Sequence, residues 1–195
     1  MTKFKTAILV GSLRKDSSNL KFAKAIANLG KDKFEAKILN IGDLPLFNQD
    51  LEGSFPAQAT RLKNEIAAAD SVLFVTAEYN RSIPGVLKNA LDWASRPYGT
   101  NSFAGKPAAV CGTSPGAIGS ACAQQHLKPV LEYLNVLLMG QPEVYLQFKE
   151  GMIDADGNIT VDGTKKFVQG FVDAYANWVN RQLANAAPAQ KAAAG

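Results

Sequence analysis

Polar and small side chains that could bind an anion lie together just after the first apolar run of the chain. The segment reads Gly11-Ser12-Leu13-Arg14-Lys15-Asp16-Ser17-Ser18-Asn19. Residues 6–10 before it form a short apolar run of β-branched and aliphatic residues, typical of a buried parallel strand, and apolar residues recur at helical spacing after it. The segment is therefore predicted to join a strand to a helix N-terminus, where free backbone amides and the helix dipole stabilise a phosphate.

The same loop lacks the glycines of the common nucleotide-binding motifs. Neither the Gly-Lys-Ser/Thr ending of a P-loop nor the three glycines of the dinucleotide fingerprint is present. Hydroxyls of Ser12, Ser17 and Ser18 stand in their place, which favours a single terminal phosphate such as that of FMN. A capped helix that binds no ligand is the alternative interpretation of this segment taken alone.

Five strand patterns alternate with helix patterns along the chain. The strands are predicted at residues 6–10, 34–39, 71–76, 107–111 and 144–148. The later helices are predicted at about 57–69, from Pro84 onward, at 120–138 and at 164–183. This alternation predicts an α/β fold, a flavodoxin-like doubly wound five-stranded parallel sheet with strand order 2-1-3-4-5. Residues 1–184 are expected to form one FMN-binding domain, and residues 185–195 a mobile tail.

Two further loops should meet the first one, because ligands of doubly wound sheets lie beyond the carboxyl ends of the strands at the switch point. These loops read Glu78-Tyr79-Asn80-Arg81-Ser82-Ile83-Pro84-Gly85 and Gly112-Thr113-Ser114-Pro115-Gly116. Their amides could bond the edge of a flavin while Tyr79 and Ile83 cover its apolar surface. The alternative is that these residues only shape turns.

Composition places the chain among ordinary globular proteins. It has 195 residues, 47% of them hydrophobic, a formal net charge of +4 and a pI near 9.0. Dispersed Lys and Arg residues do not suggest a nucleic-acid partner. No long apolar segment or leader pattern is visible, so no membrane segment and a cytoplasmic location are expected. The two cysteines are too far apart for a redox or metal pair, and Cys111 is expected to be a buried apolar residue.

Three motifs in combination resemble the NAD(P)H-dependent FMN reductase family, in particular its bacterial quinone and chromate reductases. They are Gly-Ser-Leu-Arg-x-x-Ser-x-Asn at 11–19, Glu-Tyr-Asn-x-Ser-Ile-Pro-Gly-x-Leu-Lys-Asn-Ala-x-Asp-Trp at 78–93, and Gly105-Lys106-Pro107. The resemblance covers about residues 5–183. It implies bound FMN with NAD(P)H as electron donor. The implied cofactor-binding residues are Ser12, Leu13, Arg14, Lys15, Asp16, Ser17, Ser18, Asn19, Glu78, Tyr79, Asn80, Arg81, Thr113, Ser114 and Gly116.

The resemblance also implies a reaction and an assembly. Hydride would pass from NAD(P)H to flavin N5, and two electrons would then pass to a quinone at the same face, with ping-pong kinetics. Chromate and other acceptors would be side substrates. Arg81, at the mouth of the expected pocket, is our own candidate for attracting the nicotinamide phosphate or an anionic acceptor, and no acid–base residue or metal is assigned. A homodimer or homotetramer is expected. The family commonly has Pro where this chain has Ala77, which predicts a lower flavin affinity. Some relatives have Arg and Tyr where Cys122 and Gln125 stand, which affects subunit contacts.

Three other interpretations fit the sequence less well. Residues 112–116 match the Gly-x-Ser-x-Gly pattern of hydrolases with Ser114 as nucleophile, but the one histidine, His126, follows too soon for a triad. A flavodoxin-type electron carrier would be expected to be acidic, whereas this chain is basic. Residues 154–158 have the wrong glycine position for a calcium loop and are predicted to form an Asp-Gly hairpin turn.

Overall fold

The sheet has the predicted parallel, doubly wound order. The computed structural model describes residues 3–192, with side chains to residue 186. The sheet order is β2-β1-β3-β4-β5, with β6 also pairing with β4, and all these pairs are parallel. The strands are β1 (Phe4–Gly11), β2 (Phe34–Ile38), β3 (Ser71–Thr76), β4 (Pro107–Ser114), β5 (Leu137–Leu138) and β6 (Tyr145–Gln147). The flavodoxin-like fold class is thus confirmed.

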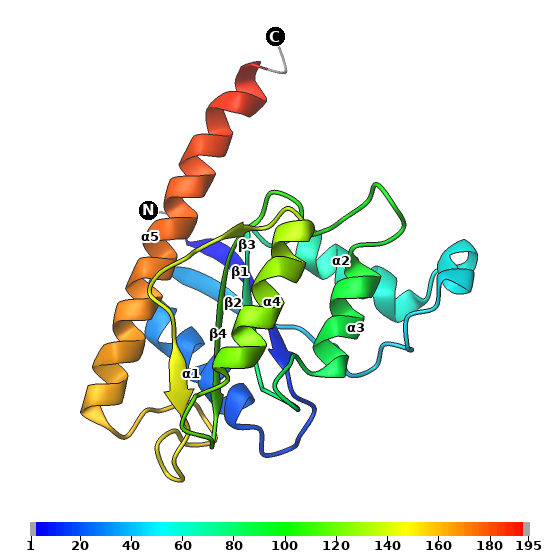
Figure 1. The fold of residues 1–195 in the computed structure, drawn as a ribbon. Coiled ribbons are helices and arrows are strands. Elements are labelled where there is room, and N and C mark those ends of the chain that lie inside the picture. Colours follow the sequence, from blue (N-terminus) through cyan, green and yellow to red (C-terminus); the bar gives the residue numbers. More distant parts are fainter. Residues whose placement is uncertain (1–2, 193–195) are drawn as a thin grey trace.

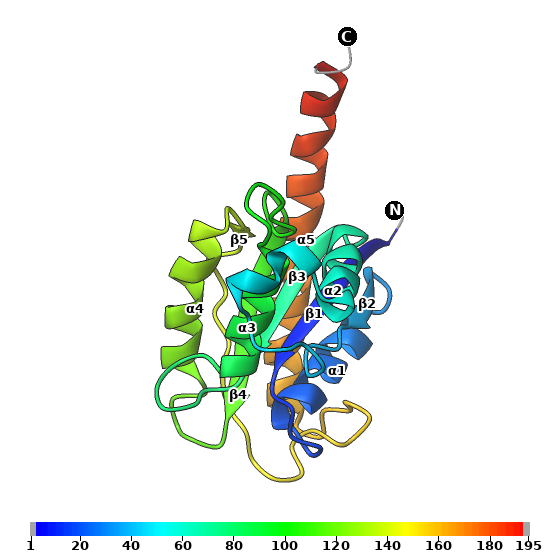
Figure 2. The same ribbon diagram turned by 90° about the vertical axis from the view of Figure 1, so that its right-hand side faces the viewer.

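Helices cover both faces of this sheet (Figures 1 and 2). One apolar core lies between the sheet and α1 and α5, and a second core lies between the sheet and α2, α3 and α4. Alternate strand residues enter the two cores, as the period of two in a strand requires: Ile8 belongs to the first and Leu9 to the second. The helices are α1 (Ser18–Gly30), α2 (Ala57–Ala67), α3 (Gly85–Ala94), α4 (Ala121–Tyr133) and α5 (Asp162–Ala192), with a 3-10 helix η1 (Gln49–Ser54).

The region around the fifth strand differs from the prediction. Helix α4 ends at Tyr133 instead of continuing to residue 138, because Asn135 has a left-handed φ of 55°. The amides of Asn135 and Val136 bond the carbonyls of Glu132 and Leu131, which is a Schellman ending. The fifth position of the sheet is therefore occupied by two short strands, β5 beside the start of β4 and β6 beside its end.

The last helix is also longer than predicted. Helix α5 continues through Ala192, past the predicted end at residue 183, and its C-terminal part extends beyond the rest of the molecule (Figure 1). Residues 185–192, predicted to be a mobile tail, are thus helical, whereas residues 193–195 lie outside the described residues. Whether the 185–192 segment moves in solution stays a prediction.

The predicted Asp-Gly turn forms between two short extended segments. Ile153 and Ile159 form an antiparallel bridge, and Asp154 Oδ1 accepts hydrogen bonds from the amides of Asp156 and Asn158. Within the described residues, no cluster of His, Cys, Asp and Glu could hold a metal ion. Among these residues there is also no helix with the length and hydropathy of a membrane span.

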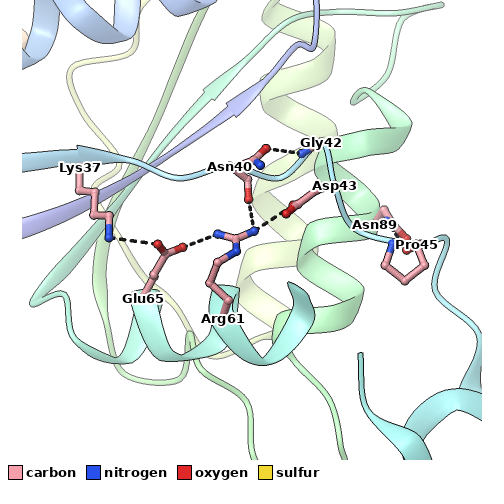
Figure 3. Close-up of polar contacts among 8 residues, drawn as sticks. All are labelled: Lys37, Asn40, Gly42, Asp43, Pro45, Arg61, Glu65 and Asn89. Carbon is pink, nitrogen blue, oxygen red and sulfur yellow. Dashed lines mark hydrogen bonds and ion pairs between the residues drawn. The ribbon is translucent and has the colours of Figure 1, made fainter. Parts of the chain in front are cut away.

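The connection that follows β2 is fixed by a polar network on α2 (Figure 3). Arg61 donates to the carbonyl of Asn40 at 2.8 Å and to Asp43 at 2.9 Å. Glu65 accepts from Arg61 at 2.6 Å and pairs with Lys37 at 3.0 Å. Because both helix and strand residues take part, this network holds the connection against the sheet.

Candidate active site

Three loops begin at the same edge of the sheet. Gly11 at the end of β1 pairs in register with Thr76 at the end of β3, and Thr76 pairs with Gly112 near the end of β4. Beyond these residues lie the loops 12–17, 77–84 and 115–120. The chain turns from β1 to β2 on one side and from β3 to β4 on the other, so this edge is the switch point where ligands of doubly wound sheets bind. The predicted convergence of the loops is confirmed.

Two amides at the start of α1 are the candidate anion-binding groups of the site. Ser17 is the N-cap, and its Oγ accepts a hydrogen bond from the amide of Leu20 at 3.1 Å. Among the described residues, the amides of Ser18 and Asn19 have no hydrogen-bond acceptor. These two donors point out of the positive end of the helix, and this is the geometry that binds a phosphate.

Charged side chains of the same loop are largely exposed. Lys21 bonds Asp16 at 2.6 Å, and this hydrogen bond and charge lower the pKa of the Asp16 carboxyl. Arg14 lies 3.6 Å from the same carboxylate and is 70% exposed. Its guanidinium is therefore available to an anion. Exposed Leu13 covers Gly42 closely, since a Cβ at Gly42 would lie 2.7 Å from Leu13 Cδ2.

A tight turn carries the exposed residues of the second loop. The amides of Tyr79 and Ser82 each donate to the carbonyl of the other at 3.0 Å. The two central residues, Asn80 and Arg81, have φ of 51° and 64°. Positive φ at both positions defines a type I′ turn. The turn leaves Tyr79 half exposed and Arg81 73% exposed at the edge of the site.

Glu78, which precedes this turn, is held against the start of α4. Its side chain is only 9% exposed; Oε2 accepts from the amide of Ala123 at 3.1 Å, and Oε1 lies 3.5 Å from Arg81. The helix N-terminus and the guanidinium together compensate the buried carboxylate. Next to it, His126 Nδ1 and Ser82 Oγ form a hydrogen bond of 3.1 Å. The second loop is therefore attached to α4 at two points.

The third loop is held through buried polar side chains. Asn19 donates to the carbonyl of Thr113 at 2.9 Å and accepts from the amide of Thr113 at 3.0 Å. Thr113 Oγ1 donates to the carbonyl of Leu146 at 2.7 Å, and Ser114 Oγ accepts from the amide of Gly116 at 3.0 Å. Since these side chains have intramolecular partners, the atoms that this loop offers to a ligand are mainly backbone atoms.

Sequence reasoning missed Gln124. Its side chain is buried on α4, and Nε2 donates to the carbonyl of Val144 at 2.7 Å and to Ser120 Oγ at 3.0 Å. These bonds fix the far end of the 115–120 loop as Asn19 fixes its near end. A polar residue in a helix is ordinarily predicted to face solvent, so the sequence contains no signal for this role.

Two alternative chemistries find no support in this geometry. In the described part of the chain, Ser114 Oγ bonds Gly116 and His126 bonds Ser82, and these two side chains do not form a nucleophile–base pair. Cys111 is fully buried, as predicted, and burial raises the pKa of its thiol. A buried thiol of this kind is inert.

The donor set instead fits a ligand with one phosphate and a flat ring. The free amides of Ser18 and Asn19 and the nearby Arg14 suit the phosphate. Backbone groups of the other two loops, with half-exposed Tyr79 beside them, suit the polar edge and the apolar surface of a ring. FMN combines these features. The fold and the site thus define a flavodoxin-like α/β protein with an FMN-type cofactor site.

Comparisons with known proteins agree with this class. Residues 4–151 match the family described as NADPH-dependent FMN reductase. A 2-hydroxy-1,4-benzoquinone reductase from a Burkholderia species is 54% identical over 175 residues, covering 90% of this chain and 96% of that protein. A quinone reductase of Pseudomonas putida is 46% identical over 177 residues, covering 90% and 95%.

A solved structure gives the same result. FerB of Paracoccus denitrificans, described as a flavoenzyme NAD(P)H:(acceptor) oxidoreductase, superposes with a TM-score of 0.89 at 50% identity, covering 92% of this chain and 98% of that one. The chain belongs to the NADPH-dependent FMN reductase family. It is an oxidoreductase whose cofactors are FMN and NAD(P)H.

Proposed function

We propose that this protein is an FMN-dependent NAD(P)H:quinone oxidoreductase that transfers two electrons at a time. The observation that carries the proposal is the meeting of an open helix N-terminus with two backbone-lined loops at one edge of the sheet. The relatives named as quinone reductases support quinones as the acceptor class.

The residues of the site divide into two groups in this proposal. The first loop, Ser12, Leu13, Arg14, Lys15, Asp16, Ser17, Ser18 and Asn19, holds the phosphate and ribityl chain of FMN through amides, hydroxyls and Arg14. The other two loops, with Glu78, Tyr79, Asn80, Arg81, Thr113, Ser114 and Gly116, hold the ring mainly through backbone atoms. When bound, FMN supplies hydride and electron transfer, and the protein supplies binding and orientation.

Donor and acceptor are proposed to use the same side of the site in turn, which gives ping-pong kinetics. Exposed Arg81 attracts the phosphate of the nicotinamide cofactor, or an oxyanion such as chromate, to that side. A surface cation contributes roughly two- to fivefold to such binding. Arg81→Ala is expected to raise the KM for NADPH by that factor with kcat nearly unchanged, while Lys88→Ala, an exposed cation on α3, leaves both unchanged. Equal KM values for Arg81→Ala and the native protein would exclude this role.

Absorption spectroscopy and turnover test the function itself. The purified protein is expected to show flavin bands, to release FMN on denaturation, and to oxidise NADPH continuously when a quinone is present. A flavin-containing protein without turnover would instead be a flavodoxin-type electron carrier. A colourless protein that takes up no FMN would refute the proposal and direct attention to Ser114 as a nucleophile.

We further propose that the enzyme is a homodimer or homotetramer, as the resemblance of its motifs implies. Light scattering at micromolar concentration is expected to give two or four times the mass of one chain, and a monomer would contradict this. The cytoplasmic location expected from the sequence is tested by cell fractionation.

A further inference from the structure

Asn19 connects two parts of the site that are far apart in the sequence. It lies in the first turn of α1, where the phosphate is proposed to bind, and its side chain is only 2% exposed. Both polar groups of its amide bond the peptide groups of Thr113, 94 residues away, at 2.9 and 3.0 Å. Both polar groups of the side chain thus have intramolecular partners, and the side chain is almost entirely shielded, whereas the backbone amide of Asn19 is free.

Thr113 lies just before the loop whose backbone is proposed to bind the flavin ring. It lies next to the last residue of β4, its own side chain is buried, and its Oγ1 bonds the carbonyl of Leu146 on β6. The carbonyl of Ser114 accepts the amide of Phe148 at 2.8 Å, so the strand side of the loop is fixed by β6. The α1 side is fixed by the side chain of Asn19. Any displacement of the end of β4, from which the third loop leaves, relative to α1 must therefore break the Asn19 bonds.

We propose that Asn19 is a positioning residue that sets the spacing between the phosphate part and the ring part of the FMN site. This inference rests on the proposed function, because it requires that FMN spans both parts. A ligand held at two places binds tightly only when their spacing matches its own. Backbone donors that move relative to the ring also bond its oxidised and reduced forms differently, and such hydrogen bonds tune a cofactor.

The test compares Asn19→Ala with a matched variant elsewhere. Asn89 on α3 is also a buried amide, 8% exposed, whose Nδ2 donates to the carbonyl of Pro45 at 2.9 Å (Figure 3). Its Oδ1 accepts from the amide of Phe47 at 2.7 Å. Asn89→Ala removes the same two kinds of bond but none between the loops of the site. Asn19→Ser, too short to bond both peptide groups, provides a second variant if Asn19→Ala does not fold.

Two quantities are measured on the holoenzymes: the dissociation constant of FMN, from flavin fluorescence on dilution, and the reduction potential of bound FMN. We expect Asn19→Ala to raise the dissociation constant about tenfold or more, because FMN must then order a segment that Asn19 holds in place in the native protein, and to shift the potential. Asn89→Ala is expected to lower thermal stability while leaving both quantities nearly unchanged.

Two results would overturn the inference. Weaker binding at an unchanged potential would mean that Asn19 acts only at the phosphate, since a phosphate contact does not affect the ring. An equal loss of FMN affinity in Asn19→Ala and Asn89→Ala would mean that both substitutions act by general destabilisation of the fold. If the native protein binds no FMN, it is the proposed function that fails, and that result is distinct from both.

Discussion

Glu143 provides a pH-dependent test of how α4 is attached to the edge of the sheet. Its carboxylate pairs with Lys128 on α4 and accepts from Gln125 Nε2 at 2.9 Å. The hydrogen bond from Lys128 is the largest cause, and that from Tyr145 the second, of a pKa of the Glu143 carboxyl that is lowered from 4.5 to about 2. Because the folded state binds this proton less readily than the unfolded state, the contribution to stability is complete above about pH 4.5 and is lost as the pH falls toward 2.

The size of this contribution follows from the two pKa values. Their difference corresponds to a contribution of at most about 3.4 kcal/mol to the free energy of unfolding, at about 1.36 kcal/mol per unit of pKa difference. The side chains of Lys128 and Glu143 are 23% and 28% exposed, and solvent screening at such a site reduces the effect. We therefore expect Glu143→Gln to lower the free energy of unfolding by about 1–2 kcal/mol at pH 7.

Urea unfolding of the native protein and of Glu143→Gln, measured between pH 7 and pH 3, gives the difference in free energy at each pH. The difference should stay constant down to about pH 4.5 and shrink below it. The exposed Lys88–Asp92 pair on α3 provides the control, since Asp92→Asn should change stability by less than about 0.5 kcal/mol at pH 7. A difference for Glu143→Gln that does not change with pH would refute the reasoning, because it would not arise from the ionised carboxylate.

Two substitutions test the packing that positions the site. A Cβ at Gly112 would lie 2.2 Å from the carbonyl oxygen of Thr76 on the neighbouring strand, so Gly112→Ala must separate β3 and β4. We expect this variant to be destabilised by about 3 kcal/mol or more and its melting temperature to fall by about 6 °C or more. An unchanged melting temperature would contradict the close approach of the two strands. Arg61→Ala removes the bonds to Asn40 and Asp43. It should lower the free energy of unfolding by about 1–2 kcal/mol and speed the hydrogen exchange of residues 40–43. Unchanged exchange of these residues would show that other contacts hold this connection.

The sheet could be predicted from the sequence because its strands carry strong local patterns. The runs at 7–10 and 72–75 are continuously apolar, as is typical of strands buried on both faces, and the structure places them side by side at the centre. The predicted end of α4 was wrong, because the backbone conformation of a single residue ends this helix. Asn135 adopts a positive φ and ends α4 five residues early, and asparagine does so only in a minority of contexts. The apolar run that follows it suits a helix as well as a strand.

The meeting of the three loops could be predicted from the sequence, but the contacts that their residues make could not. The motif that contains Asn19 and the motif that contains Thr113 each mark a loop, yet nothing in either motif indicates that these two residues bond one another. Such a contact depends on the register of β1, β3 and β4, which brings the two loops to one edge.

Burial divides the predicted site residues into two kinds with different consequences for mutation. Ser17, Asn19 and Thr113 are buried, and their side chains cap a helix or bond backbone groups. Arg14 and Arg81 are largely exposed and paired only at 3.5 Å or more. Substitutions of the first kind change the shape of the site and should affect every ligand together, whereas substitutions of the second kind remove a charge and should affect anionic ligands selectively. A kinetic comparison between a neutral quinone and an anionic acceptor therefore separates residues that build this site from residues that select what enters it.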